Sequence, residues 1–204
     1  PVESSPPPSG PGCKKWPFIY FPPVLITPGC VGVYLPDSVR LTSSLVGNMN
    51  GYRISSYTWY DINGRVVQST LVNQTSTTVS ITPTKNAVYT VKVKLVHNCA
   101  LPVTLIDIVS VYVASRPTLI VVPCISYRPG VDNGVEISAR VTGASSLLTT
   151  FKWTSQSGNT YYTRDVTVVP KRSPEVFTAT LTYSRTCFAS GTVVAQTTVK
   201  TAEI

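Results

Sequence analysis

The sequence predicts an all-β protein with two tandem antiparallel β-sandwich domains and an extended N-terminal arm. Three observations support this prediction: an internal repeat, a composition typical of half-exposed strands, and short alternating segments separated by turn residues. Of the 204 residues, 43% are hydrophobic and only 13% are charged, about half the usual charged fraction of ~25%. Threonine, serine, valine and tyrosine are frequent instead, and such residues suit strands that expose one face.

The internal repeat is visible as four landmark residues that recur at matched spacing. They are Cys30 with Cys124, Trp59 with Trp153, Tyr89 with Phe177, and Cys99 with Cys187. The first two pairs are 94 residues apart (124 − 30 and 153 − 59), and the last two are 88 apart (177 − 89 and 187 − 99). Such self-similarity indicates two copies of one unit. We therefore expect a first sandwich over residues 28–115 and a second over 116–204, each of a common domain size.

The first copy contains alternating segments in the order expected of a sandwich. The dipeptide Asn63-Gly64 is a strong signal for a two-residue β-hairpin. From Tyr89 to Leu95, apolar residues alternate with threonine and lysine, so that one face packs on a core and the other faces water. We expect strands at 39–42, 55–60, 65–67, 77–81, 89–95 and 104–113.

The second copy repeats this order with a turn at Ser157-Gly158-Asn159 and a break at Pro170. Its expected strands are 135–141, 151–154, 166–169, 177–183 and 192–200. No segment shows a sustained helical period with caps. About seven short strands per copy, with turns every ~8–12 residues, are typical of a two-sheet antiparallel sandwich.

The first 27 residues differ from both copies and form the predicted tail and arm. Residues 1–12 are rich in proline, serine and glycine and are expected to be extended. Residues 14–27 are strongly apolar but contain three prolines, which exclude a central strand and favour an edge strand or an extended arm. The arm either packs on its own first domain or adds to the sheet of a neighbouring molecule. Its candidate partner-binding residues are Trp16, Phe18, Ile19, Tyr20, Phe21, Val24 and Ile26.

Repeat symmetry predicts one disulfide per sandwich, Cys30–Cys99 in the first and Cys124–Cys187 in the second. Each later cysteine lies ten residues after a core aromatic (99 − 89 and 187 − 177), an even spacing that keeps both on the core face of one strand. Loops of about 60–70 residues would make each bond worth on the order of 4 kcal/mol. Other pairings of five cysteines stay open. Cys13 is either free or bonded to another chain. Disulfides indicate an oxidising compartment, so we expect a secreted or cell-surface protein.

Trp59 and Trp153 lie mid-strand at equivalent positions. We expect each to be a core tryptophan beside the disulfide of its sandwich rather than a binding residue. Trp16 lies outside the repeats and has no equivalent, so it is the tryptophan expected to contact a partner.

The charges favour neither a nucleic-acid partner nor a membrane span. The net charge is +8, from 17 basic and 9 acidic residues, but the basic residues are scattered rather than gathered into a stripe. No run of about 20 apolar residues occurs. The expected acidic partner, if any, is a polyanionic envelope or a cell-surface glycan. Asn73 begins an Asn-Gln-Thr sequon and is a candidate for glycosylation.

No residue pattern indicates catalysis, a metal or a cofactor. The only histidine, His97, follows an expected core strand beside a cysteine, and is predicted to be a loop residue rather than a general base. The nine acids are dispersed, and only Asp132 and Glu136 are near neighbours. There is no CxxC pair for zinc and no DxDxD run for calcium. The protein is therefore not expected to be an enzyme.

The residues resemble a known family. Tyr57-Thr58-Trp59, then Ile81-Thr82-Pro83-Thr84, then Tyr89-Thr90-Val91 ending in Cys99 are similar to the PKD-like and immunoglobulin-like (Ig-like) repeats of large microbial surface proteins. The resemblance covers residues 28–114 and, more loosely, 116–200. The turn after Trp59 lacks the aspartate- and glycine-rich PKD signature, so Ig-like is the better description. The resemblance implies non-catalytic spacers, adhesive modules or filament subunits.

These observations lead to one functional hypothesis and two alternatives. The hypothesis is a non-catalytic structural subunit of a cell-surface filament or assembly, a homo-oligomer or homopolymer joined through the arm by β-strand addition. The first alternative is an adhesive or carbohydrate-binding module of a larger surface protein. The second is a pair of accessory domains of a secreted hydrolase.

Overall fold

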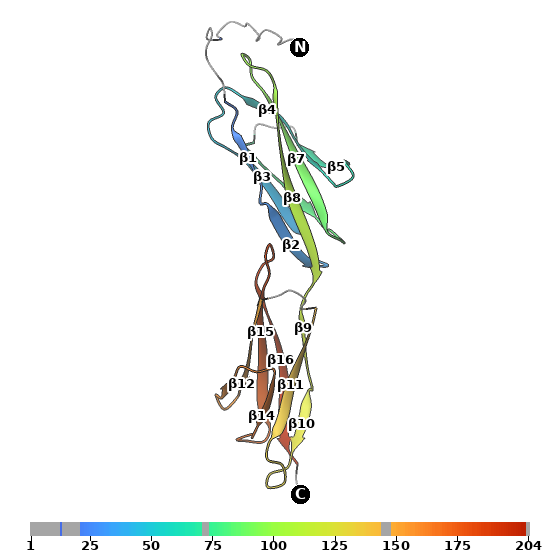
Figure 1. Ribbon diagram of the computed structural model, residues 1–204, viewed down its shortest axis with the longest axis vertical. Helices are drawn as coiled ribbons and strands as arrows, with labels where there is room; N and C mark the ends of the chain where they lie inside the picture. The colour runs from blue at the N-terminus through green and yellow to red at the C-terminus, as the bar shows by residue number, and fades with distance from the viewer. Residues whose placement is uncertain (1–12, 14–20, 71–73, 144–147, 203–204) are drawn as a thin grey trace. The chain divides into compact units, whose positions relative to one another are not determined.

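The computed structural model describes residues 13, 21–70, 74–143 and 148–202, and all sixteen elements in these ranges are β-strands (Figure 1). The chain divides into two compact units, Pro1–Val113 and Ala114–Ile204. Each unit contains one sheet of three strands and one of five. The predicted all-β fold class is confirmed for the described residues.

The first unit contains eight strands in two sheets. The strands are β1 (Val24–Ile26), β2 (Cys30–Leu35), β3 (Val39–Val46), β4 (Arg53–Tyr60), β5 (Val66–Thr70), β6 (Ser76–Ile81), β7 (Ala87–Val96) and β8 (Val103–Ser115). The smaller sheet has the order β1-β3-β6, and the larger has the order β2-β8-β7-β4-β5. The β4–β7 and β7–β8 pairs are both antiparallel, and β7 and β8 also follow one another in the chain.

The second unit has the same topology as the first. Its strands are β9 (Thr118–Val121), β10 (Cys124–Tyr127), β11 (Val135–Thr142), β12 (Leu148–Ser155), β13 (Thr160–Tyr161), β14 (Asp165–Val168), β15 (Glu175–Ser184) and β16 (Gly191–Thr201). The sheets are β14-β11-β9 and β10-β16-β15-β12-β13. Each strand of the first unit therefore has a counterpart eight strands later. The counterpart lies in the corresponding sheet of the second unit, next to the counterparts of the same neighbouring strands.

A tryptophan lies at the centre of each core, as predicted. Trp59 and Trp153 are both 0% exposed. The indole Nε1 of Trp153 donates a hydrogen bond to the carbonyl of Arg164 at 3.1 Å, whereas no described residue accepts one from Nε1 of Trp59. Alternating residues of β7 and β15 are buried on the core side of their sheets, because side chains at i and i+2 share one face of a strand. Those residues are Val91, Val93 and Leu95 in the first unit, and Phe177, Ala179 and Leu181 in the second.

Candidate functional site

The described part of the arm pairs with its own domain. Strand β1 runs antiparallel to β3, with Val24 opposite Val46 and Ile26 opposite Ser44. Leu25 packs against the core, while Val24 and Ile26 point outward and are exposed. Of the two arrangements left open by the sequence, this is the one within a single chain. Among the predicted anchors, Trp16, Phe18, Ile19 and Tyr20 lie outside the described residues.

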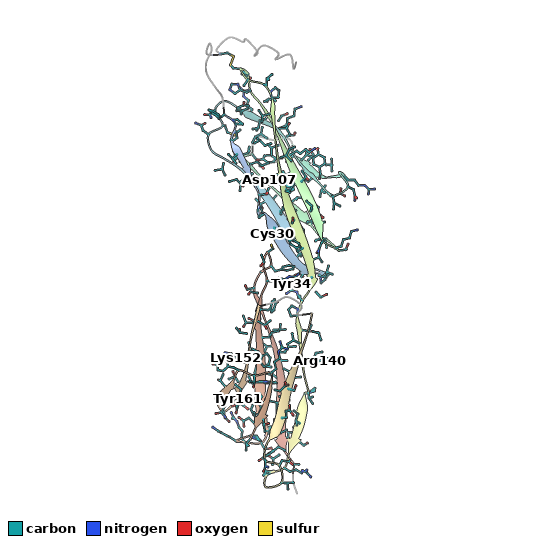
Figure 2. The ribbon with its side chains drawn as sticks, viewed as in Figure 1. Cys30, Tyr34, Asp107, Arg140, Lys152 and Tyr161 are labelled. Atoms are coloured by element: carbon teal, nitrogen blue, oxygen red, sulfur yellow. A yellow bond between two sulfur atoms is a disulfide. The ribbon has the colours of Figure 1, made fainter. Side chains whose placement is uncertain are left out.

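Asp107 fixes the point where the arm passes from one sheet to the other. Its Oδ2 accepts hydrogen bonds from the backbone N–H and the hydroxyl of Thr27, at 2.9 and 2.7 Å. Thr27 directly follows β1 of the three-stranded sheet, whereas Asp107 lies in β8 of the five-stranded sheet (Figure 2). The other carboxylate oxygen accepts the N–H of Ile108 at 2.9 Å. The half-buried Asp107 carboxylate thereby accepts hydrogen bonds from backbone N–H groups at the point where the chain leaves one sheet and enters the other.

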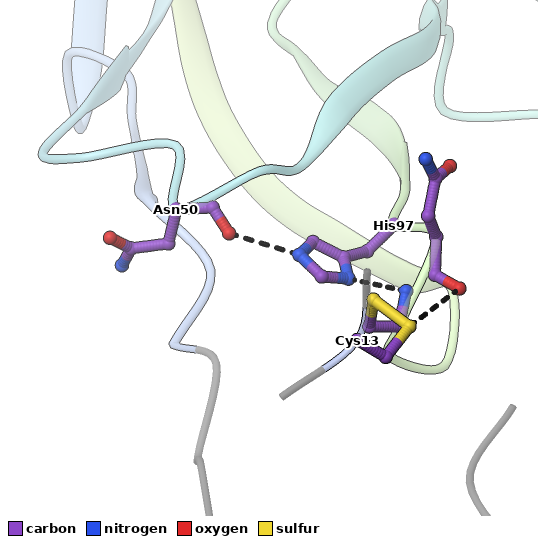
Figure 3. The surroundings of a disulfide bond; sticks show 5 residues. Cys13, Asn50 and His97 are labelled. Carbon is purple, nitrogen blue, oxygen red and sulfur yellow. Dashed lines mark hydrogen bonds between the residues drawn. A yellow bond between two sulfur atoms is a disulfide. The ribbon is translucent and has the colours of Figure 1, made fainter. Parts of the chain in front are cut away.

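A disulfide attaches the start of the arm to the loop after β7. Cys13 is bonded to Cys99, with 5.3 Å between their Cα atoms (Figure 3). His97 shapes this loop, because its Nδ1 accepts the N–H of Cys99 at 2.8 Å and its Nε2 donates to the carbonyl of Asn50 at 3.0 Å. These two partners require the neutral imidazole with its proton on Nε2. His97 is therefore a structural loop residue here.

Gly51 allows the histidine to approach the β3–β4 loop this closely. Its φ of +85° is in the left-handed region, and a Cβ atom at this position would lie 2.6 Å from His97 Nε2. The phenol ring of Tyr52 also packs against the imidazole, with 4.9 Å between ring centroids. The loop that carries Cys99 is thus held by hydrogen bonds and by packing.

The two predicted disulfide pairings are wrong. Cys99 is bonded to Cys13 rather than to Cys30, and Cys124 is a free, exposed thiol rather than a partner of Cys187. Cys13, predicted to be free or bonded to another chain, is bonded within this one. Cys30 and Cys187 are disulfide-bonded, as predicted of their state.

The physical reason for the wrong pairings is where the strands end. β7 ends at Val96 and β15 at Ser184, three residues before their cysteines (99 − 96 and 187 − 184). The even spacing from a core aromatic fixes a side chain's face only while the strand continues. Neither core cluster contains a cysteine, so each buried tryptophan packs among aliphatic and aromatic side chains without the adjacent disulfide that was expected.

The outer face of the larger sheet in the first unit combines apolar and basic side chains. Ile106 and Ile108 of β8 are 59% and 55% exposed. Lys92 and Lys94 of β7 are exposed beside them, because Lys92 pairs with Ile106 across the two strands. Among the described residues, neither lysine forms a salt bridge. This face therefore presents uncompensated positive charge next to apolar surface.

A shallow hollow of about 420 Å³ lies at the β4–β5 side of this face. Lys92 Nζ lies 5.1 Å from the centroid of the Tyr60 ring, within the range of a cation–π contact. The Asp61 carboxylate is engaged in the turn, where its Oδ1 accepts the backbone N–H groups of Asn63 and Arg65 at 2.8 and 2.9 Å. The hollow is lined by Tyr60, Asp61, Ile62, Gly64, Val88, Thr90 and Lys92.

A second hollow of about 550 Å³ occupies the equivalent place in the second unit. Its lining is Thr154, Ser155, Gln156, Val176, Thr178 and Gln196. By the repeat spacing, Thr154 is the counterpart of Tyr60, and Val176 that of Val88 (154 − 60 and 176 − 88). The concavity thus belongs to the repeat, while its chemistry differs: aromatic and cationic in the first unit, hydroxyl and amide in the second.

Glu175 is a buried carboxylate that the sequence did not single out. It is 1% exposed, and its oxygens accept the backbone N–H groups of Lys171 at 2.6 Å and Ser157 at 3.3 Å. Burial opposes ionisation, but hydrogen bonds from Ser157, Lys171 and Ser155 outweigh it and lower the pKa of Glu175 below its ordinary value of 4.5. The carboxylate ties two loops to the start of β15, which is a structural role. Glu175 lies two residues before the predicted strand 177–183, and no sequence signal pointed to it as a buried carboxylate.

No group of three metal-binding side chains occurs among the described residues. In the same residues, no helix has the length and apolar character needed to cross a membrane. Asn73, the predicted glycosylation site, lies outside the described ranges.

Comparison with known proteins relates the chain to others by fold alone. No family model and no curated protein sequence matches it. Among solved structures, Sidekick-1 immunoglobulin domains 1–5 have a TM-score of 0.47 at 16% identity, covering 89% of this chain and 39% of that one. An E-to-A variant of titin domains I67–I69 has a TM-score of 0.42 at 13% identity, covering 89% and 66%. Fibronectin(III)-like modules of Clostridium thermocellum CbhA have a TM-score of 0.43 at 10% identity, covering 87% and 95%.

The fold is identified from the strand order within the sheets of this chain. Each unit packs a three-stranded sheet on a five-stranded sheet, and in the second unit the parallel pairing of β10 with the last strand β16 closes one side of the larger sheet. The same arrangement occurs twice along the chain. The protein is a tandem pair of Ig-like β-sandwiches.

Proposed function

We propose that the protein is a non-catalytic structural module of an extracellular, cell-surface assembly. The observation that carries this proposal is the attachment of the arm within the chain. Strand pairing at Val24–Ile26, the Asp107 hydrogen bonds and the Cys13–Cys99 disulfide all hold the arm on its own domain. A unit that completes its own sheets in this way is a self-contained building block, so contacts with other molecules use its outer surfaces.

Cysteine chemistry supports the extracellular location. Four of the five cysteines are disulfide-bonded, and such bonds persist in oxidising compartments but are rare in the cytosol. Exposed threonines and serines on the strands agree with sheet faces that contact water.

Immunogold electron microscopy with antibodies against the folded chain tests this proposal. On intact, unpermeabilised cells of the source organism, gold is expected on ordered or extended structures outside the cell envelope. Labelling that requires permeabilisation would contradict the extracellular assignment. Surface labelling of isolated molecules, without any assembly, would contradict the structural role.

An adhesive function for the same module is the second candidate, and the Tyr60–Lys92 hollow favours it. Apolar side chains next to an unpaired lysine suit an acidic saccharide, whose ring C–H groups pack on the apolar surface while its carboxylate pairs with the ammonium group. A second copy of the chain fits this face less well, because a symmetric contact would bring Lys92 and Lys94 close to their own copies.

Binding to a uronic-acid oligosaccharide, measured by isothermal titration calorimetry at two salt concentrations, tests the adhesive candidate. Lys92→Gln is expected to lower the affinity and to make the affinity less dependent on salt. Tyr60→Ala is expected to lower the affinity at both salt concentrations. Lys152→Gln is the matched control, since Lys152 is exposed on the equivalent sheet of the second unit. Equal loss in the control, or no binding by the unaltered chain, would eliminate this candidate.

A further inference from the structure

The free thiol of Cys124 is exceptional in this chain. Cys124 is exposed and begins β10, where it lies opposite Thr198 of β16. The two apolar residues just before it, Ile120 and Val122, are also exposed. An exposed thiol is unusual in a protein whose other four cysteines are oxidised.

The first unit shows what this position does when its partner is present. Cys30 is the counterpart of Cys124, because both are the first residue of the second strand of their unit and both occupy the same place in the repeat. Cys30 is disulfide-bonded. The same position of the same fold therefore forms a disulfide in one copy and carries a free thiol in the other.

The Cys13–Cys99 bond indicates which kind of cysteine is missing. Cys99 lies in the loop between the last two strands of its unit, β7 and β8, and its partner Cys13 precedes the first strand of that unit, β1. A loop cysteine thus reaches back to a cysteine that comes before its own sandwich. Cys187 occupies the equivalent loop of the second unit and is also bonded.

We infer that Cys124 forms a disulfide with the loop cysteine of a further Ig-like unit of this repeat. That unit either follows in the same polypeptide or belongs to another molecule, and it covers the exposed Ile120 and Val122 when it binds. The inference deepens the proposed function, on which it rests, by naming the partner and the bond that join one module to the next. In the second unit, Cys124 is the covalent attachment point of the assembly.

The bond forms by two thiol–disulfide exchanges with a low-molecular-weight disulfide as the oxidant. The Cys124 thiolate attacks one sulfur of that disulfide, forming a mixed disulfide and releasing one small thiolate. The loop thiolate of the partner then attacks the Cys124 sulfur and releases the second small thiolate. Two protein thiols lose two electrons and two protons in total, and one small disulfide becomes two small thiols.

Disulfide mapping of the native protein tests the inference. The protein is extracted from its source in the presence of iodoacetamide, digested without reduction and analysed by mass spectrometry. Cys124 is expected in a cross-linked peptide whose other half carries a loop cysteine from a second Ig-like unit. A change in mass on non-reducing against reducing gels assigns that unit to another molecule, and an unchanged mass assigns it to the same polypeptide.

Two results would overturn the inference, and they are distinguishable from failure of the proposed function. Alkylated Cys124 in the extracted protein would show that no partner is attached, whatever the immunogold labelling shows. A Cys124–Cys124 cross-link would show that the partner is a second copy of this position rather than a loop cysteine.

The isolated 204-residue chain supplies an independent measurement. In oxidised glutathione, one glutathione per chain is expected on Cys124, and none on the Cys124→Ser variant. Failure of the unaltered chain to react would show that the thiol is inaccessible and would equally contradict the inference.

Discussion

Replacing Glu175 tests whether a single buried carboxylate organises the loops of the second unit. The Glu175→Gln variant keeps the shape of the side chain but has only one acceptor oxygen, and its NH₂ group faces a backbone N–H. The carboxylate accepts N–H groups from Lys171 and Ser157, and hydrogen bonds to a charged group contribute about 1.5–3 kcal/mol each. We expect Glu175→Gln to lower the free energy of unfolding of the second unit by about 2 kcal/mol. Glu175→Ala should cost about 3–5 kcal/mol, since it leaves both donors buried without a partner.

The stabilisation by Glu175 is expected to depend on pH, and its direction follows from the pKa of the carboxyl group. The pKa of Glu175 is lowered in the folded state, so the unfolded chain binds more protons at acidic pH. The stabilisation is therefore fully present above the unfolded-state pKa, near the ordinary value of 4.5, and is lost as pH falls through the lower, folded-state pKa. Unaltered protein and Glu175→Gln should differ most near pH 7 and converge at low pH.

Urea unfolding followed by tryptophan fluorescence measures both effects, and Trp153 in the core of the second unit provides the local signal. Glu136→Gln is the control, because Glu136 is an exposed acid on β11 of the same unit and should change the stability by less than ~0.5 kcal/mol. If Glu175→Gln behaves like the control, or if its difference from the unaltered protein does not shrink at low pH, the reasoning from the hydrogen bonds is refuted.

Three further predictions follow from the cores and the arm. Trp153→Phe should lower the free energy of unfolding by about 1 kcal/mol more than Trp59→Phe does, because only Trp153 loses an indole hydrogen bond. Chemical denaturation measures both values, and equal losses would contradict the hydrogen-bond argument. Cys13→Ser should destabilise the first unit by up to about 4 kcal/mol in thermal unfolding, since the bond closes a sequence separation of 86 residues, and an unchanged midpoint would show that the bond restrains nothing. Asp107→Asn should cost about 1–2 kcal/mol and accelerate amide exchange at Thr27; unchanged protection there would show that the carboxylate does not hold the crossing.

The two units differ in the surfaces that they present. The larger sheet of the first unit exposes Ile106, Ile108 and two lysines, whereas the equivalent strands β15 and β16 of the second unit expose Thr182, Thr192, Val194, Gln196 and Lys200. On β15, Thr178, Thr180 and Thr182 occupy the outward positions. Copies of one fold that keep their cores and change their outer faces are free to contact different partners, since outward side chains do not determine the packing.

The local pattern of the sequence was sufficient to predict the strands and the cores. The alternation from Tyr89 to Leu95 appears in β7 with every predicted core residue buried or half-buried, because a strand places residues i and i+2 on one face whatever the rest of the chain does. The matched positions of Trp59 and Trp153 likewise predicted two buried indoles. These features depend on a few neighbouring residues, and the same pattern occurs in both copies of the repeat.

The tertiary structure alone decided the features that join distant parts of the chain. The partner of Cys99 depends on where β7 ends and on the fold of the loop that His97 holds, and neither follows from strand periodicity. The pairing of β1 with β3 depends on whether an edge in the same chain is open to the arm, and the buried position of Glu175 depends on loops that converge only after folding. The sequence by itself determined two sandwiches with tryptophan-centred cores, because burial in a sheet follows a two-residue period. Only the folded chain decided which cysteines form disulfides, where the arm docks and which thiol stays free. These features require residues that are far apart in the sequence to come into contact.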